Sequence, residues 1–344
     1  MEPRYQAWLP RFLAHGVDYN DFVSTVADLE SWSGWLPAWV ETAEAHEQLG
    51  EAAAAGGNSR TAGEAFLRAS LCYHYAKFLW LEDTVAYWET TERCVASHQR
   101  AMGFLDSTFR RLEIPFEDDR IVANLRLPGH AGTWPCVVLV PGMDSAKEEF
   151  PVWEDTILSR GMATISLDGP GQGEAGRTNS LRPDHERAVG ALIDVLATRD
   201  EIDDSRIGIT GVGMGGYFAT RVAAFEPRIT AAGVIGGAYR FSRMPEIIKQ
   251  KFMFSSRIDV EEEAESYADT FTTEGIMERV LQPYLVIHGA RDAVMPPEQA
   301  RRAADQAPRG EFFLYPDGNT ACQSVNHKLR PFLADWFGAR LDVG

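Results

Sequence analysis

The sequence predicts an α/β protein built on a doubly wound, mostly parallel sheet of eight strands. Continuous apolar runs such as Cys136–Gly142 and Pro283–Gly289 are typical of strands covered on both faces. These runs alternate with helical patterns of apolar residues, as in chains whose parallel strands are joined by helices. The first 108 residues carry only helical patterns, so we expect a helical cap domain before the sheet.

The strongest helical pattern of the cap is Thr61–Trp80, where apolar residues recur at three- and four-residue spacing. A second helix is expected over Phe22–Leu29, after Tyr19-Asn20-Asp21. The alanine- and glycine-rich stretch Glu51–Arg60 predicts a joint, at which Gly56, Gly57 and Asn58 end one helix and Ser59 or Thr61 caps the next.

From Arg110 the apolar period changes to two. The stretches 110–116 and 120–128 alternate around the acidic turn Glu117–Asp119, which predicts an antiparallel hairpin. Buried strands should follow at 136–142, 163–171, 206–211, 229–237, 283–289 and 310–318. The charged helical stretch Tyr239–Val280 interrupts them, so we expect a core of 109–238 and 281–344 with 239–280 inserted over the carboxyl edge of the sheet.

The composition limits the classes of partner. The net charge is −17 with no basic cluster, which disfavours nucleic acids and anionic membranes, and no apolar stretch is long enough to span a bilayer. The N-terminus has no secretory pattern, so we expect a cytoplasmic protein whose partner is a small molecule. The four cysteines (Cys72, Cys94, Cys136 and Cys322) show no metal-binding spacing, so we expect buried free thiols and neither metal nor cofactor.

Gly211–Gly215 lies between a predicted strand and a predicted helix, the setting of a G-x-S-x-G nucleophile elbow. The central residue is Gly213, which can adopt the strained turn but cannot attack a substrate. A phosphate-binding reading is open because Gly211, Gly213 and Gly216 also match G-x-G-x-x-G. That fingerprint belongs in the first strand–helix unit, with an acidic residue further on, and neither condition is met here.

Other segments should reach the same edge of the sheet. Backbone amides of Met143 and Met214 are candidate oxyanion donors, and Asp144 is a candidate substrate contact. Asp292 follows a strand and occupies the acid position of a Ser–Asp–His order, although a turn-capping role is the alternative. In the loop after the last strand Thr320 is a candidate substrate contact, and His327 lies several residues later, where we expect the first turn of the last helix.

Three stretches carry a family resemblance: Val140–Glu149 (VPGMDSAKEE), Leu167–Glu174 (LDGPGQGE) and Ala65–Phe78 (AFLRASLCYHYAKF). They resemble hydrolases of the α/β-hydrolase fold similar to 2,6-dihydroxypseudooxynicotine hydrolase and the fermentation–respiration switch protein, which carry an N-terminal helical cap. The resemblance implies cleavage of carbon–carbon or ester bonds by a Ser/Asp/His triad without metal, and cap-mediated homodimers. By position Asp292 matches the acid, but Gly213 replaces the serine and Thr320 the histidine.

Loss of the triad leaves three function classes. The leading hypothesis is a non-hydrolytic enzyme that cyclises, isomerises, decarboxylates or otherwise changes carbon–carbon bonds of a β-dicarbonyl or polyketide-like compound, as in natural-product biosynthesis. The alternatives are a hydrolase whose nucleophile is mutated or relocated, and a small-molecule binding protein. A replacement base could be Asp292 or a residue from the following set: Tyr73, His74 or Tyr75 of the cap helix, and Tyr239 or Glu246 of the insertion. Of this set, His74 and Tyr239 are also candidate substrate contacts.

Overall fold

A computed structural model describes residues 3–237, 239–240 and 244–343, and it divides the chain into two units. The helical unit comprises Met1–Phe109 and Glu148–Val152, and the sheet unit comprises Arg110–Lys147 and Trp153–Gly344. The short segment Glu148–Val152 therefore groups with the first 109 residues although it lies well beyond them in the sequence.

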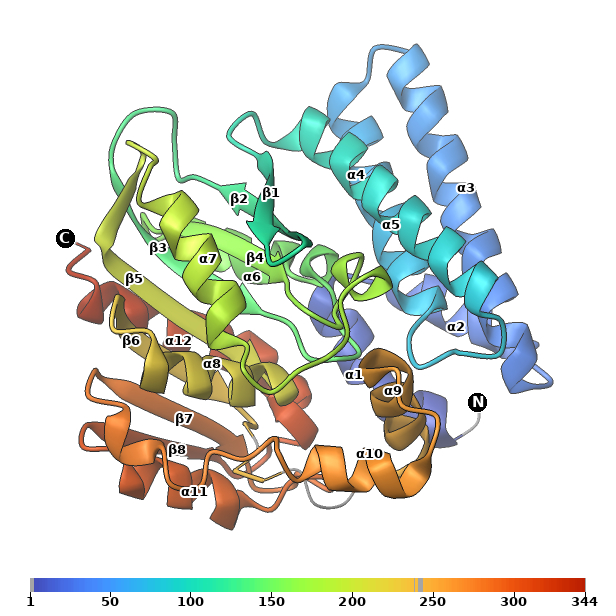
Figure 1. Ribbon diagram of the computed structural model, residues 1–344. Helices are drawn as coiled ribbons and strands as arrows, with labels where there is room; N and C mark the ends of the chain where they lie inside the picture. Colours follow the sequence, from blue (N-terminus) through green and yellow to red (C-terminus); the bar gives the residue numbers. More distant parts are fainter. Residues whose placement is uncertain (1–2, 238, 241–243, 344) are drawn as a thin grey trace. The chain divides into compact units, whose positions relative to one another are not determined.

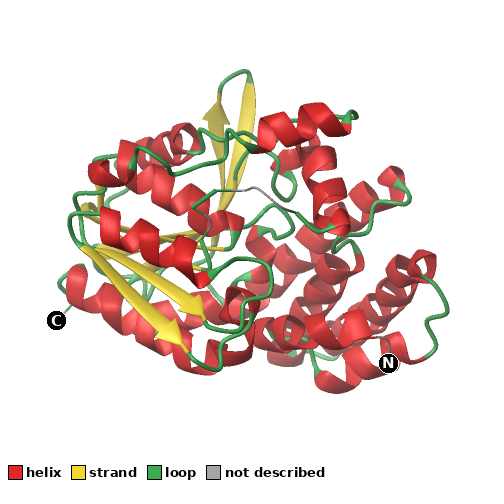
Figure 2. Cartoon of the chain, turned by 90° about the horizontal axis from the view of Figure 1, so that it is seen from below, coloured by secondary structure: helices red, strands yellow, loops and turns green. Residues whose placement is uncertain are grey.

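The helical unit contains α1 (Pro3–His15), α2 (Tyr19–Ala27), α3 (Trp35–Ala55), α4 (Ser59–Ala76) and α5 (Thr84–Leu105). Helices α3, α4 and α5 run side by side (Figure 1), and no strand occurs among described residues 3–109 (Figure 2). The predicted helices are confirmed, with α4 ending four residues earlier than expected. The predicted N-terminal capping residue of α4, Ser59 or Thr61, is wrong. Asn58 precedes α4 and makes no side-chain capping hydrogen bond, and Ser59 is already helical.

Aromatic side chains form much of the interior of this unit. Phe12 stacks on Tyr75 with ring centroids 3.7 Å apart, and Trp35 Nε1 donates a hydrogen bond to the Tyr75 carbonyl at 2.9 Å. Trp39 and Trp80 are also buried. Large aromatic rings remove much apolar area from water, so these residues stabilise α1, α3 and α4 against one another.

The sheet unit holds one eight-stranded sheet of order β1-β2-β4-β3-β5-β6-β7-β8. Strands β1 and β2 form the predicted antiparallel hairpin, β2 pairs antiparallel with β4, and the remaining pairs are parallel. The doubly wound, mostly parallel sheet is therefore confirmed. The strands are β1 (Arg110–Phe116), β2 (Asp119–Arg126), β3 (Trp134–Val140), β4 (Ala163–Asp168), β5 (Ile202–Val212), β6 (Ile229–Ile235), β7 (Tyr284–Gly289) and β8 (Gly310–Tyr315).

Helices cover both faces of the sheet. Figure 1 shows α7 (Glu186–Leu196) and α8 (Met214–Phe225) in front and α12 (Asn326–Arg340) behind. Glycines on β5 and β6 let α12 approach closely: a Cβ on Gly208 would lie 2.8 Å from the Phe337 ring, and one on Gly233 would lie 2.6 Å from Leu333. The other helices are α6 (Pro151–Leu158), α9 (Glu246–Ser256), α10 (Glu261–Ala268) and α11 (Pro297–Gln306).

The charged segment before β7 forms α9 and α10 and contacts the chain downstream of β4 and the start of α8. Its position over the carboxyl edge of the sheet stays a prediction. The Leu181 amide, downstream of β4, donates to the Ser255 carbonyl at 2.7 Å, and Tyr267 Oη donates to the Leu181 carbonyl at 3.0 Å. Phe271 contacts Tyr217 of α8. Residues 238 and 241–243 of the predicted insertion lie outside the described part of the chain. Coverage of this edge by the helical cap stays a prediction.

All four cysteines are buried and free, as predicted. None of the described helices is long and apolar enough to cross a membrane.

Candidate active site

Gly213 forms the turn between β5 and α8, as the elbow motif predicts. Its φ is 60° and its ψ −119°, in the region that favours glycine, and its amide donates to the Ile235 carbonyl at 2.8 Å. A Cβ on Gly213 would meet no atom within 4 Å. The elbow backbone is therefore complete, and open space stands where a nucleophilic side chain would project. Its place on the fifth strand also disfavours the phosphate-binding reading.

The flanking glycines allow β3 and α8 to meet at the elbow. A Cβ on Gly215 would overlap the Val140 carbonyl oxygen, and one on Gly211 would overlap the Gly215 carbonyl. Val140 also pairs with Gly211 in the parallel ladder, so the loop that begins at Pro141 emerges beside the elbow. Glycine at 211 and 215 is required by this backbone approach, while glycine at 213 is not required by any neighbouring atom.

Met143 and Met214 are the candidate oxyanion donors. Met214 is the first residue of α8, where backbone amides have no intrahelical acceptor, and Met143 lies in the loop after β3. Neither amide donates a hydrogen bond to any residue within the described ranges. Asp144 follows Met143 and is half-buried. The two amides are therefore available to a ligand oxygen, and their catalytic role stays a prediction.

A buried ionic network fixes the loop after β3. Lys147 Nζ lies 2.8 Å from Asp168 Oδ2 and 2.5 Å from Glu174 Oε1, and the Lys147 amide donates to Asp168 Oδ1 at 2.8 Å. Burial would raise the pKa of Glu174, but Lys147 and Arg111 hold it at about 2. Gln172 Nε2 donates to the Pro141 carbonyl. The loop that carries Met143 is thus held from several sides.

The stretch Leu167–Glu174 supplies Asp168, Gln172 and Glu174, whose side chains hold the loop after β3. The sequence prediction did not include Lys147, although a lysine directly before two glutamates in Val140–Glu149 was a visible signal. Its side chain is 0% exposed, and such a buried charge requires ionic partners.

Asp292 lies beyond β7 with its side chain buried. Its Oδ1 accepts from the amides of Val294 and Met295 at 2.8 and 2.9 Å, and its Oδ2 accepts from the Ala321 amide at 3.1 Å. His288 Nε2 lies 3.7 Å from Oδ2 and donates to the Met295 carbonyl. Asp292 therefore caps its own turn and also contacts the loop that would carry a catalytic histidine.

That loop brings Thr320 next to Asp292. Thr320 Oγ1 accepts from the Ala293 amide at 3.3 Å. Ala321 and Cys322 follow with φ of 53° and 58°, a conformation that is uncommon for residues with a side chain. Burial raises the pKa of the Cys322 thiol to about 12. His327 is exposed in the first turn of α12, as expected from its distance along the chain.

The three candidate bases of the cap helix lie inside the helical unit. Tyr73 Oη donates to Glu47 at 2.7 Å, and Tyr75 Oη donates to Glu149 at 2.9 Å. His74 Nε2 lies 3.3 Å from Glu149 Oε2, and burial lowers the pKa of its imidazole. Each of these groups faces a partner within its own unit, and the substrate role of His74 stays a prediction.

The two candidates from the insertion are also engaged elsewhere. Tyr239 is buried, and its hydroxyl donates to Gln306 of α11 at 2.8 Å. Glu246 is exposed at the start of α9 and pairs with Lys249 at 3.1 Å. The structure thus brings together residues 143, 213 and 214 at the elbow and residues 292 and 320 beside one another. It gives Tyr239 and Glu246 protein partners of their own.

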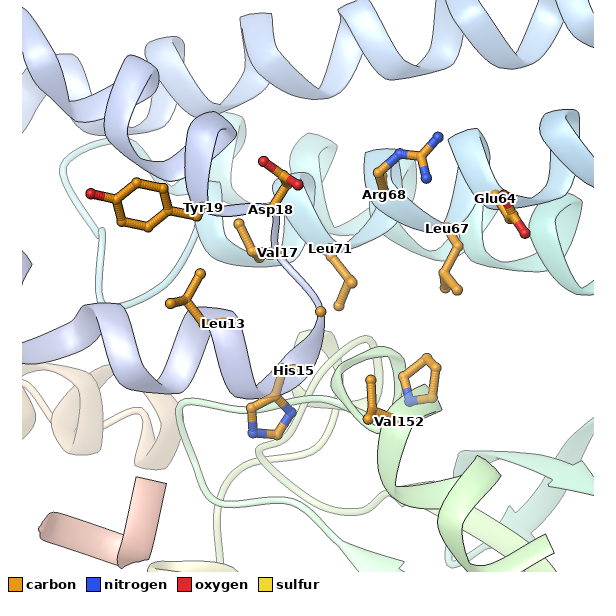
Figure 3. A pocket seen from close by; sticks show the side chains of 12 residues that line it. Leu13, His15, Val17, Asp18, Tyr19, Glu64, Leu67, Arg68, Leu71 and Val152 are labelled. Carbon is orange, nitrogen blue, oxygen red and sulfur yellow. The ribbon is translucent and has the colours of Figure 1, made fainter. Parts of the chain in front are cut away.

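The helical unit contains hollows of its own. One cavity of about 430 Å³ lies between α1, the start of α2 and α4 (Figure 3). Its wall is apolar, and Asp18, Glu64 and Arg68 supply charges. None of the candidate residues predicted from sequence lines this cavity. The apolar lining residues include Leu13, Val17, Leu67, Leu71 and Val152.

Comparison with known proteins settles the family. The FrsA-like esterase family matches residues 14–300, most of the chain. The chain belongs to the FrsA-like family. This FrsA-like chain is 30% identical to the 2,6-dihydropseudooxynicotine hydrolase of Paenarthrobacter nicotinovorans over 335 residues, covering 95% of this chain and 89% of that protein. The predicted resemblance is confirmed.

Several fungal α/β hydrolases are also similar to the FrsA-like chain, which spans about half of their length. An α/β hydrolase of Xenoacremonium sinensis, xenA, is 31% identical over 237 residues, covering 63% of this chain and 54% of that protein. Among solved structures, the 2,6-dihydroxy-pseudo-oxynicotine hydrolase superposes with a TM-score of 0.89 at 28% identity, covering 97% of this chain and 95% of that one. The α/β-hydrolase fold with its N-terminal helical region is therefore established.

Proposed function

We propose that this FrsA-like protein is an enzyme that activates a carbonyl group of a small molecule without forming a covalent bond to its elbow. One observation carries the proposal: the elbow keeps its backbone conformation and two available amides, while Gly213 leaves open space in place of a nucleophile. Preorganised amides stabilise negative charge that develops on a carbonyl oxygen, and this does not require serine.

The first candidate reaction is non-hydrolytic carbon–carbon bond chemistry, such as decarboxylation, isomerisation or cyclisation of a β-dicarbonyl or polyketide-like compound. Each proceeds through an enolate or oxyanion that the amides of Met143 and Met214 would bind. Such a site can also hold a flexible substrate in a reactive conformation, which lowers the barrier by several kcal/mol. Position 213 supports this candidate because a substrate atom can occupy the vacated space.

The second candidate is hydrolysis of a carbon–carbon or ester bond, and the names of the relatives favour it over the first. In this case the attacking oxygen comes from water above Gly213 or from another side chain. Ser145, in the loop after β3, is a candidate relocated nucleophile. A binding protein without turnover is the third class.

We infer a small molecule as partner, because the net charge of −17 opposes binding to nucleic acids or anionic membranes. A cytoplasmic location and a homodimer are part of the same proposal.

The test uses activated esters, a fluorophosphonate probe and a panel of β-dicarbonyl compounds in heavy-oxygen water. We expect the probe to leave the protein unlabelled and esters to turn over no faster than with denatured protein. Products that carry heavy oxygen from solvent would select hydrolysis, and products without it would select the first candidate. Stoichiometric labelling of Ser145 would instead show a relocated nucleophile. Ligand binding without any product would contradict an enzyme.

Restoring the triad checks the elbow assignment. Gly213→Ser alone should give no efficient esterase, because Thr320 cannot take the serine proton. Gly213→Ser combined with Thr320→His should give weak activity on activated esters. Efficient ester turnover by Gly213→Ser alone would show that another base already serves position 213.

A further inference from the structure

Three side chains with metal-binding atoms meet inside the helical unit. Asp21 of α2, His46 of α3 and Cys72 of α4 each offer one such atom, and these atoms all lie within 4.8 Å of one another. His46 Nε2 and Asp21 Oδ2 are 2.7 Å apart, a hydrogen-bond distance. The three residues are far apart in the sequence and match no metal-binding motif, so only the packing of three helices assembles them.

The thiol is the buried member of the cluster. Cys72 is 1% exposed and makes no hydrogen bond to a residue of the described ranges, whereas the side chains of His46 and Asp21 are 16% and 25% exposed. Burial and the nearby Asp21 carboxylate raise the pKa of this thiol. An unactivated, enclosed thiol is a poor nucleophile for a substrate, but it can bind an ion that displaces its proton.

A cavity of about 660 Å³ gives access to the cluster. Asp21 and His46 lie on its wall, together with the acidic residues Asp28 and Glu41. Carboxylates around such an opening raise the local concentration of cations. The cluster therefore has a buried sulfur ligand on one side and an open, acidic approach on the other.

We propose that Asp21, His46 and Cys72 form a zinc site with three protein ligands and a fourth position facing the cavity. Thiolate, imidazole and carboxylate are the ligands that Zn²⁺ takes in proteins. A bound thiolate and carboxylate would balance the two charges of the ion. Bonds of about 2.0–2.3 Å require the ligand atoms to lie about 3–4 Å apart. The His46–Asp21 hydrogen bond must therefore open slightly, and Cys72 must release its proton to solvent.

The competing explanation is structural: the Asp21–His46 pair joins α2 to α3, and Cys72 fills space beside it. The two explanations differ in what the metal-free protein does with added ion. A site predicts saturable binding of one Zn²⁺ per chain and a rise in melting temperature with Zn²⁺ concentration. A structural pair predicts neither. The proposal is independent of the elbow, since it concerns residues of the helical unit alone.

The experiment titrates the full-length, chelator-treated protein with Zn²⁺, and with Co²⁺ as a spectroscopic probe. We expect one equivalent to bind and a sulfur-to-cobalt charge-transfer band to appear. Cys72→Ser and His46→Gln each remove a proposed ligand, so each should weaken Zn²⁺ binding by about 100-fold or more, at or beyond the roughly 10- to 100-fold loss that follows removal of a supporting outer contact. Cys72→Ser should also remove the charge-transfer band. Cys94→Ser is the matched control, because Cys94 is buried in α5 of the same unit, and it should bind like the parent protein.

The absence of stoichiometric binding, or a Cys72→Ser protein that keeps both the cobalt band and the affinity, would overturn the proposal. If Cys72→Ser fails to fold, as circular dichroism would show, His46→Gln still decides the question because its side chain is partly exposed. Unchanged affinity in a folded His46→Gln protein would equally overturn it.

Discussion

At Gly213 the backbone keeps the elbow conformation while the side chain is absent. A φ of 60° costs glycine little, and nothing within 4 Å would contact an added Cβ. Strain of about 1–3 kcal/mol is therefore the main structural cost of a side chain at this position. The open space beside Gly213 allows the proposed substrate position to be probed by substitution.

We predict that Gly213→Val abolishes activity on the native substrate and lowers the free energy of unfolding by no more than the backbone strain. The valine methyl groups would fill the space beside the two candidate oxyanion donors. Turnover assays and thermal melts of the same preparation check this. Full activity in a folded Gly213→Val protein would place the chemistry away from the elbow.

Asp292 allows a second prediction, because both of its oxygens accept backbone amides. In Asp292→Asn the side-chain NH₂ group would face either the backbone N–H of Ala321 or the backbone N–H groups of Val294 and Met295. At least one of these N–H groups would then lose its acceptor. We expect a loss of about 1–3 kcal/mol in unfolding free energy from an unsatisfied donor. If Asp292 is also the base, the rate should fall by about 100-fold or more. Denaturant unfolding and turnover assays measure the two effects, and an Asp292→Asn protein with parental stability and full activity would contradict the contacts seen here.

His185 predicts a pH dependence of stability. It is buried, stacked on Phe218 with centroids 4.3 Å apart, and burial lowers its pKa to about 3. In the unfolded chain the His185 imidazole binds a proton near pH 6.5, whereas in the folded chain it stays neutral down to about pH 3. Above pH 6.5 the imidazole is neutral in both states, and its full contribution to the free energy of unfolding is present. This contribution is lost as the pH falls from 6.5 toward 3, by up to about 1.4 kcal/mol per pH unit.

Urea unfolding of the parent protein and of His185→Gln across this range should show a shallower pH slope in the variant. His327→Gln, at an exposed histidine of the same unit, is the control and should keep the parent slope. Equal slopes for the parent and His185→Gln would mean that His185 is protonated in the folded state.

At the scale of elements, the junction of β3, β5 and α8 depends on glycine. A Cβ on Gly215 would overlap the Val140 carbonyl, so α8 and β3 could not keep their separation. We predict that Gly215→Ala destabilises the sheet unit by several kcal/mol, since backbone must move. Gly338→Ala is the control in α12, where nothing lies within 4 Å, and it should stabilise by about 0.5–1 kcal/mol. Denaturant midpoints of the two variants and the parent protein measure these effects. A Gly215→Ala midpoint equal to that of the parent would show that the backbone at this junction moves at little cost.

At the scale of the whole molecule, the prediction that the helical cap encloses the elbow can be tested by thiol labelling. All four native cysteines are buried, so Gly213→Cys adds one reporter over a low background. We expect a small methanethiosulfonate to react with it and a polymer-linked maleimide to react at least about 10-fold more slowly than with Val85→Cys, which replaces a 65% exposed residue. Equal maleimide rates would mean that the edge is open to bulk solvent.

Apolar periodicity and glycine-rich turns act over a few residues of chain, so they predicted the order of the helices and strands and the place of Gly213 at the elbow. The position of Asp292 after a strand and the family resemblance assigned Asp292 to the acid position and Thr320 to the histidine position of the triad, and the roles of both residues stay predictions. Two groups of distant side chains meet through tertiary packing alone: Lys147 with Asp168 and Glu174, and Asp21 with His46 and Cys72. The packing that joins them depends on the fit of whole elements, and no local pattern in the sequence encodes it.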